Sequence, residues 1–202
     1  MSNAVPNAGQ DFDAARRVMV ASQLRPQGVT NARVLAAMGF VPREDYVGAG
    51  QKSVAYGDRS VRLDNDVPMM APADLGQLLD RLDPVPGERA LVVGGGGAYA
   101  AAILRHIGLT VETTHSAEKS GSDPYDLILV EGAIERLPTS LAQCLAAGGR
   151  AGAPIIEDGV VRLATGRVAV DPAGKQSVAF ISFAEAQVPI LPGFSSAPAF
   201  VF

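Results

Sequence analysis

Apolar residues recur at helical spacing in three segments of the first 86 residues. These segments are residues 11–24, 31–40 and 73–82. A period near 3.6 predicts amphipathic helices, with Thr30 as a candidate N-cap of the second and Pro72 in the first turn of the third. Residues 42–68 show no sustained period and are predicted to be extended or looped. Residues 1–86 therefore form a predicted N-terminal helical segment, on the substrate side of the site inferred below.

The pattern changes at residue 87, where short apolar runs typical of strands begin. The predicted strands are residues 89–93, 109–114, 125–133, 150–156, 160–170 and 176–186. Two helical patterns lie between them, at residues 98–107 with Gly108 as the C-cap and at residues 137–149. The last two strands flank Asp-Pro-Ala-Gly-Lys, which predicts an antiparallel hairpin.

This order of elements predicts an α/β fold with a doubly wound, mostly parallel sheet of the Rossmann-like type. Residues 87–202 form this sheet as one compact unit with an antiparallel hairpin at its end. Ligands of such sheets bind at the carboxyl ends of the strands. Residues 94–97 are four glycines that follow the first strand of the sheet, so this turn is the first candidate site.

Composition narrows the function classes. The chain has 202 residues, of which 48% are hydrophobic and 19% charged, and its net charge is −4. These values favour a soluble globular protein without a nucleic-acid partner bound through a broad basic surface. The longest apolar run is too short to span a membrane and no secretory signal is visible, so we expect no membrane partner and a cytoplasmic location.

The same composition argues against a metal site. Cys144 is the only cysteine, and the chain has two histidines, His106 and His115. Cys144 stands among apolar residues and is expected to be a small buried hydrophobe. His106 lies in the last turn of its predicted helix, where the helix dipole favours a partly charged imidazole.

Several motifs, in order along the chain, carry a resemblance to one family. Residues 20–47 contain Gln-Leu-Arg, Gly-Val, Arg-Val-Leu, Ala-Met and Val-Pro-Arg-Glu, and residues 55–58 read Ala-Tyr-Gly-Asp. The stretches at 125–133 and 137–150 follow in the expected order. Together they resemble the protein-L-isoaspartate O-methyltransferases. The N-terminal motif is specific, because other methyltransferases and dehydrogenases do not carry it.

The resemblance implies a seven-stranded, S-adenosylmethionine-dependent methyltransferase. Its members methylate isoaspartyl carboxylates of damaged proteins, which starts their repair. An isoaspartyl protein or peptide is therefore the partner that the resemblance implies, and S-adenosylmethionine is the cofactor.

The implied cofactor loop is an acidic residue, any residue, then G-x-G-x-G. Gly94 and Gly96 match the first two glycines, and Gly95 lies between them, so all three are candidate cofactor-binding residues. Ala98 replaces the third glycine and Val92 replaces the acid, which the family uses for the amino-acid end of the cofactor. Losing one charge-assisted contact costs about 1.5–3 kcal/mol, or roughly ten- to a hundredfold in affinity.

The resemblance also implies an acid at the tip of the second strand, which accepts hydrogen bonds from the ribose. His115 is the best match, while Glu112 fits only if the register slides and it then lies mid-strand. A neutral imidazole accepts one hydrogen bond and does not replace a carboxylate. Glu131, at the end of a later apolar strand, is a further candidate cofactor-binding residue. A solvated strand-end carboxylate without function is the alternative for Glu131.

The third implied anchor, which reads the adenine, has no counterpart. Nine residues separate His115 from Tyr125, whereas a parallel crossover with its helix needs at least about 10–12. We therefore expect the strand and helix that normally follow the second strand to be missing. An uncovered sheet region favours a homo-oligomer that buries it.

The implied active-site motif, G-Q-T-I-S-Q-P, is also changed. Residues 66–72 align with it, and only Pro72 matches, with Met70 in place of the hydroxyl. No catalytic residue is assigned. Met69 and Met70 are either core filler or the lining of a pocket left by a lost substrate site.

Three functions stay open at this point. The chain is a working methyltransferase with a reduced pocket, a pseudo-methyltransferase that serves as a binding or assembly module, or a binder of another small molecule. The glycines themselves have two further interpretations. They form a plain strand-to-helix turn, or a dinucleotide turn of the G-x-G-x-x-G type in which Tyr99 takes the third glycine's place.

Overall fold

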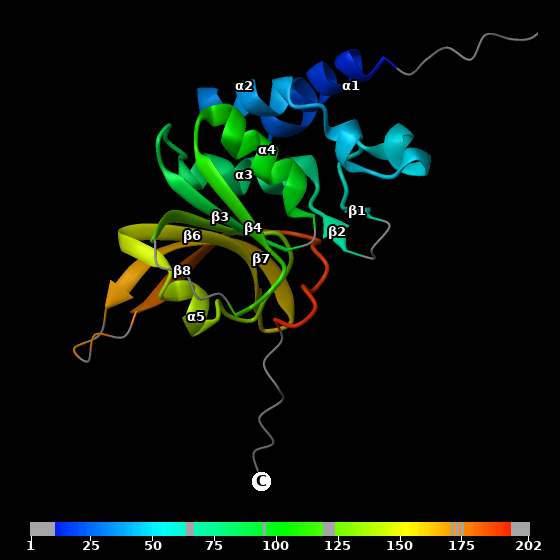
Figure 1. Ribbon diagram of the computed structural model, residues 1–202. Coiled ribbons are helices and arrows are strands. Elements are labelled where there is room, and N and C mark those ends of the chain that lie inside the picture. The colour runs from blue at the N-terminus through cyan, green and yellow to red at the C-terminus, as the bar shows by residue number, and fades with distance from the viewer. Residues whose placement is uncertain are drawn as a thin grey trace, which may run out of the picture.

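A six-stranded sheet with helices gathered mainly on one face forms the body of the protein (Figure 1). The computed structural model describes residues 11–63, 67–94, 96–118, 124–170, 172, 174 and 176–194. α3 and α4 lie directly over the sheet, and α1 and α2 form an outer layer above them (Figure 1).

The helices of the N-terminal segment form where the apolar period predicts them. They are α1 (Phe12–Met19), which continues as a π-helical turn η1 (Val20–Leu24), α2 (Ala32–Phe40) and α3 (Pro72–Leu82). The expected N-cap Thr30 of α2 is wrong by one residue. The Asn31 side chain accepts hydrogen bonds from the N–H groups of Arg33 and Val34, while the Thr30 N–H donates to Asp80 at 2.6 Å.

The stretch predicted to be extended or looped contains short 3-10 turns. These are η2 (Arg43–Tyr46) and η3 (Ala49–Val54). Two-residue strands β1 (Val61–Arg62) and β2 (Pro68–Met69) then pair antiparallel. Met69 and Met70 are fully buried in the core, which confirms core filler as their structural role.

All six expected strands form the sheet. They are β3 (Arg89–Val93), β4 (Thr110–Thr114), β5 (Tyr125–Val130), β6 (Leu145–Glu157), β7 (Val160–Val170) and β8 (Gln176–Glu185). Their order is β4-β3-β5-β6-β7-β8, with the first four parallel and the last two antiparallel. The mostly parallel α/β fold and its terminal hairpin are thereby confirmed.

β4 is one edge of this sheet. Among the described residues, no strand pairs with its outer side, and residues 115–118 and 124 contain neither helix nor strand. The described sheet therefore has the shortened form that the brief stretch after His115 predicts.

One predicted helix is cut short by a strand. α4 (Gly97–Ile107) ends at Gly108, whose φ of +108° suits a glycine C-cap as expected. The expected helix at 137–149, however, is only the four-residue α5 (Thr139–Ala142), and β6 begins at Leu145. Tyr125 pairs with Leu145 before a register shift, so pairing with β5 overrides the local helical pattern.

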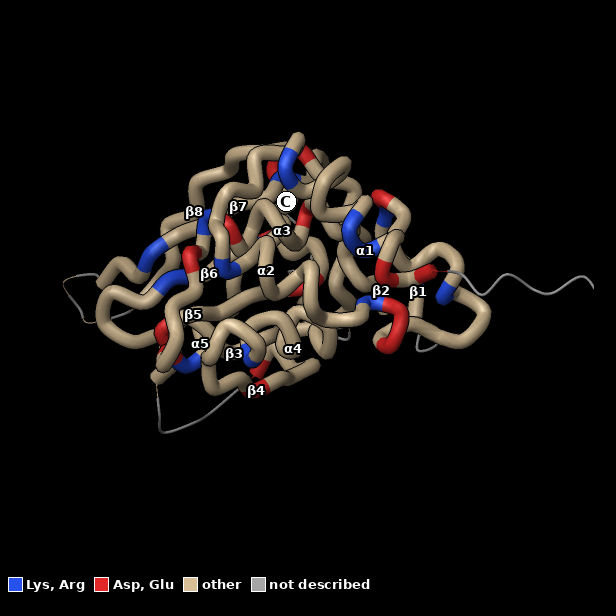
Figure 2. The backbone as a smooth tube through the Cα atoms, turned by 90° about the horizontal axis from the view of Figure 1, so that it is seen from above, with Lys and Arg blue, Asp and Glu red and all other residues tan. Residues whose placement is uncertain are grey.

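The two faces of the sheet bury separate apolar clusters. The larger lies under α1–α4 and the smaller lies on the opposite face, near α5. Cys144 belongs to the smaller cluster, which confirms its expected burial. His106 stacks on Phe40 with ring centroids 4.3 Å apart. Acidic and basic residues are interspersed along the tube in the view of Figure 2.

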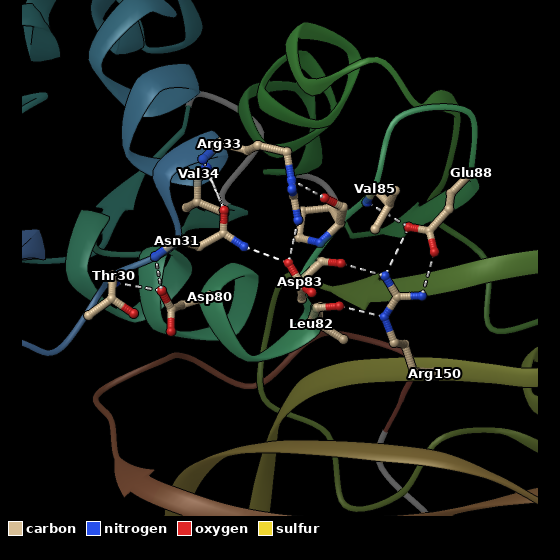
Figure 3. Close-up of polar contacts among 11 residues, drawn as sticks. Thr30, Asn31, Arg33, Val34, Asp80, Leu82, Asp83, Val85, Glu88 and Arg150 are labelled. Atoms are coloured by element: carbon tan, nitrogen blue, oxygen red, sulfur yellow. Dashed lines mark hydrogen bonds and ion pairs between the residues drawn. The ribbon is translucent and has the colours of Figure 1, made fainter.

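Polar contacts join α2 and α3 to the sheet (Figure 3). Arg150 of β6 donates to the Leu82 and Asp83 carbonyls and, with both terminal nitrogens, to Glu88 at 2.9 Å. The side chain of Asp83 in turn accepts hydrogen bonds from Asn31 and Arg33. The end of α3 is thus fixed to both layers.

Candidate functional site

The glycine turn lies at the carboxyl edge of the sheet, between β3 and α4. Gly94 has a φ of +121°, and its N–H donates to the Thr114 carbonyl at the end of β4 at 2.9 Å. Gly96 immediately precedes α4. Gly95, also expected to bind the cofactor, lies outside the described residues.

The turn packs directly against the chain's own atoms. A Cβ built on Gly94 would lie 2.6 Å from the Glu131 carbonyl oxygen. One built on Gly96 would lie 2.5 Å from the Pro68 carbonyl oxygen, 2.9 Å from the Met69 Cα and 3.0 Å from Glu131 Oε2. Glycine is therefore required at both positions by contacts within the protein itself.

Glu131, next to this turn, is fully buried rather than solvated. Its N–H donates to the Val93 carbonyl at 2.8 Å, which fixes its backbone beside β3. Both carboxylate oxygens are buried without a hydrogen-bond partner within the protein. Burial raises the pKa of Glu131 to about 8, against the opposing effect of the Arg43 charge. The alternative of a solvated strand-end carboxylate is thus wrong.

Arg43 is the buried cation that faces this carboxylate. It is fully buried, and donates to the Ala55 carbonyl at 2.7 Å and the Met70 carbonyl at 2.6 Å. Its guanidinium carbon lies 4.9 Å from the centroid of the Tyr99 ring. Like the two Glu131 oxygens, Arg43 Nη1 and the Tyr99 hydroxyl are buried without a hydrogen-bond partner within the protein. Burial lowers the pKa of Arg43, opposed by Tyr99 and Glu131.

A second polar group supports Arg43 from the N-terminal side. The Tyr56 hydroxyl accepts from the Arg43 N–H and donates to Glu44. Arg16 donates to both Tyr56 and Glu44, at 2.9 and 3.1 Å. A chain of hydrogen bonds in the core therefore joins Arg16 of α1 to Arg43.

Arg43 is a functional-site residue that the sequence pattern does not indicate. Arg43 lies within the Val-Pro-Arg-Glu motif, and Glu131 was singled out only as a strand-end acid. They are 88 positions apart, and no local pattern indicates that they meet. A charged residue within a motif of otherwise structural residues is the one signal that could have drawn attention to it.

The other candidates are placed differently. His115 follows β4 directly and is exposed at the same edge as Gly94. Glu112 lies in the middle of β4, as expected, and pairs with Arg89 at 3.1 Å. Tyr99 is fully buried in α4 under Arg43, so it does not supply the open backbone of a dinucleotide turn.

Among the cavities on the described surface are four that do not include Gly94, Gly96, His115 or Glu131. One of about 840 Å³ lies by the start of α3, and one of about 520 Å³ lies by its end. Among the described residues, no three His, Cys, Asp or Glu side chains are grouped to hold a metal ion. No described helix is long and apolar enough to cross a membrane.

Comparison with known proteins gives a consistent result. The sequence profile of the protein-L-isoaspartate(D-aspartate) O-methyltransferase family matches residues 15–122. Protein-L-isoaspartate O-methyltransferase 1 of Rhodopseudomonas palustris is 31% identical, over 85% of this chain and 82% of that protein. The protein-L-isoaspartate O-methyltransferase of Aeropyrum pernix is 32% identical, over 72% of this chain and 70% of that protein.

Solved structures agree on the fold. A Plasmodium falciparum protein described as a protein-L-isoaspartate O-methyltransferase, in complex with S-adenosyl-L-homocysteine, superposes with a TM-score of 0.68. The superposition covers 87% of this chain and 97% of that protein at 18% identity. A second protein-L-isoaspartate O-methyltransferase gives a TM-score of 0.69, over 88% of this chain and 66% of that one.

Proposed function

The chain belongs to the protein-L-isoaspartate O-methyltransferase family, and on that premise we propose that it is a pseudo-methyltransferase. The family reaction is S-adenosylmethionine-dependent methylation of isoaspartyl carboxylates in damaged proteins. In this chain the cofactor site is degraded, and the fold serves instead as a binding or assembly module.

The closed packing of the glycine turn is the observation that carries this proposal. In the family pattern, glycines let the backbone approach the cofactor. Here Gly94 and Gly96 let the backbone approach Glu131 and Pro68, at distances that leave no room for a methyl group. Contacts within the protein therefore account for both glycines without a bound adenosyl cofactor.

The substituted anchors support the same proposal. Val92, at the position of the family's acid, is fully buried in β3 and cannot accept a hydrogen bond from its side chain. His115 stands for the acid of the ribose anchor, and the described sheet ends at β4, where the adenine anchor would follow. At about 1.5–3 kcal/mol for each lost charge-assisted contact, two such losses weaken binding by a hundredfold or more.

Calorimetric titration with S-adenosylmethionine and S-adenosylhomocysteine tests the proposal directly. We expect no heat of binding and no thermal shift at millimolar ligand. The Rhodopseudomonas palustris relative, at 31% identity, is the matched control that should bind under the same conditions. A micromolar dissociation constant for this chain would refute the proposal, and methyl transfer to an isoaspartyl peptide would then establish the enzyme.

The outer edge of β4 is the proposed self-association surface of this module. An edge strand presents unpaired N–H and C=O groups, which a second copy satisfies by pairing. We expect a dimer in sedimentation at micromolar concentration, and a clean monomer would contradict this part of the proposal. The cytoplasm is the proposed compartment, which the single cysteine, Cys144, favours.

A further inference from the structure

A groove of about 520 Å³ lies on the opposite side of the molecule from the glycine turn. It runs between the last turn of α3 and the faces of β7 and β8. Arg150, which also lines it, is in the first half of β6, whereas the glycine turn follows the carboxyl end of the parallel β3. The groove is therefore separate from the proposed cofactor remnant.

The floor of the groove is apolar and open to solvent. Ala179, Ile181 and Phe183 alternate along β8 and so lie on one face of the strand. Thr165 and Arg167 of the paired strand lie opposite Ile181 and Ala179 on the same face. Ile181 is 75% exposed, which is unusual for a large aliphatic side chain on a sheet face beside a helix.

Two arginines stand at the sides of this floor. The guanidinium carbon of Arg81, in α3, lies 5.0 Å from the centroid of the Phe183 ring. Arg167 of β7 donates one hydrogen bond, to the Gly148 carbonyl at 3.3 Å. No acidic residue lines the groove, and within the described chain neither arginine forms an ion pair.

Arg150 lines the same groove but, unlike Arg81 and Arg167, forms an ion pair. Its guanidinium is held by Glu88 and by the Leu82 and Asp83 carbonyls (Figure 3). It therefore fixes the wall of the groove, and the unpaired positive charge comes from Arg81 and Arg167.

We propose that this groove binds a small, soluble amphipathic anion. A carboxylate, sulfonate or phosphate head is held by Arg81 and Arg167, because guanidinium groups donate paired hydrogen bonds to such planar or tetrahedral anions. An aromatic or branched apolar body lies on Ile181 and Phe183, whose exposed surface it covers. The volume is within the range of small-molecule sites, about 300–1,000 Å³.

Two fluorescent probes that differ in charge test both halves of the proposal. They are 1-anilinonaphthalene-8-sulfonate, an aromatic anion, and N-phenyl-1-naphthylamine, its neutral counterpart. The chain has no tryptophan, so the intrinsic signal interferes little. We expect the anion to bind the wild-type protein and to be displaced by 4-phenylbutyrate, an aromatic carboxylate.

The variants separate charge from apolar contact. Arg81→Gln with Arg167→Gln should weaken binding of the anion about tenfold or more and leave the neutral probe within about twofold. Ile181→Ser should weaken both probes. Phe40→Ser is the matched control, because Phe40 is 65% exposed in a different apolar groove beside Arg17.

Three results of these binding measurements would overturn the proposal. Equal losses of both probes in the arginine variant would show that the charges play no part. A loss in Phe40→Ser as large as that in Ile181→Ser would show nonspecific adsorption. Either result, or no binding by the wild-type protein, overturns the proposal, provided that circular dichroism shows each variant to be folded. None of these results depends on whether S-adenosylmethionine binds.

Discussion

The buried carboxyl of Glu131 should make the unfolding free energy of the protein depend on pH. Burial raises its pKa in the folded protein from 4.5 to about 8. Between these values the unfolded chain has released a proton that the folded protein keeps. The contribution of this group to stability is therefore full below about pH 4.5 and is lost as the pH rises towards 8.

The size of the effect follows from the displacement of the pKa. At about 1.36 kcal/mol per pKa unit, a rise from 4.5 to about 8 corresponds to at most about 5 kcal/mol. Arg43 is close enough to favour the ionised form, and the two groups titrate together, so we expect about 3–5 kcal/mol. Glu131→Gln removes this titration and keeps the shape of the side chain.

Urea unfolding followed by far-ultraviolet circular dichroism, at several values between pH 5 and 8, measures the effect. The wild-type protein should lose about 2–4 kcal/mol more unfolding free energy over this range than Glu131→Gln, because part of the titration lies outside it. Other titrating groups are common to both proteins and cancel in the difference. Glu118→Gln, which changes an exposed carboxylate, should retain the wild-type dependence. Parallel curves for the wild-type protein and Glu131→Gln would refute the assignment of a neutral, buried Glu131.

Two further predictions concern the packing of the glycine turn and a second buried carboxyl, in the first turn of α3. Gly96→Ala places a Cβ 2.5 Å from the Pro68 carbonyl oxygen and should lower the unfolding free energy by about 1–3 kcal/mol. Gly50→Ala, which meets nothing within 4 Å, should change it by less than about 0.5 kcal/mol, and equal effects in urea titrations would contradict the close packing of the turn. Burial and the nearby Asp58 raise the pKa of Asp74 to about 6, so the stability that this group contributes is lost as the pH rises through 6. Asp74→Asn should therefore melt above the wild-type protein at pH 7 but not at pH 4, and an unchanged difference between the two pH values would exclude this titration.

Local chemistry accounts for most elements that the sequence predicts correctly. Pro72 begins α3, Gly108 ends α4, and the sequence Asp-Pro-Ala-Gly-Lys lies between the paired strands β7 and β8. Each signal depends on backbone conformation within a few residues. The family resemblance and the short stretch after His115 are likewise properties of the sequence alone.

The predictions that failed depend on partners far along the chain. Leu145 is strand rather than helix because it pairs with Tyr125, and this pairing outweighs local helical spacing. Glu131 is fully buried in the assembled fold, where it feels the charge of Arg43 from the distant N-terminal segment. The anion groove likewise combines α3 with the far end of the hairpin. Periodicity and turn chemistry determine which elements form, while burial and pairing between distant side chains exist only once the sheet has assembled.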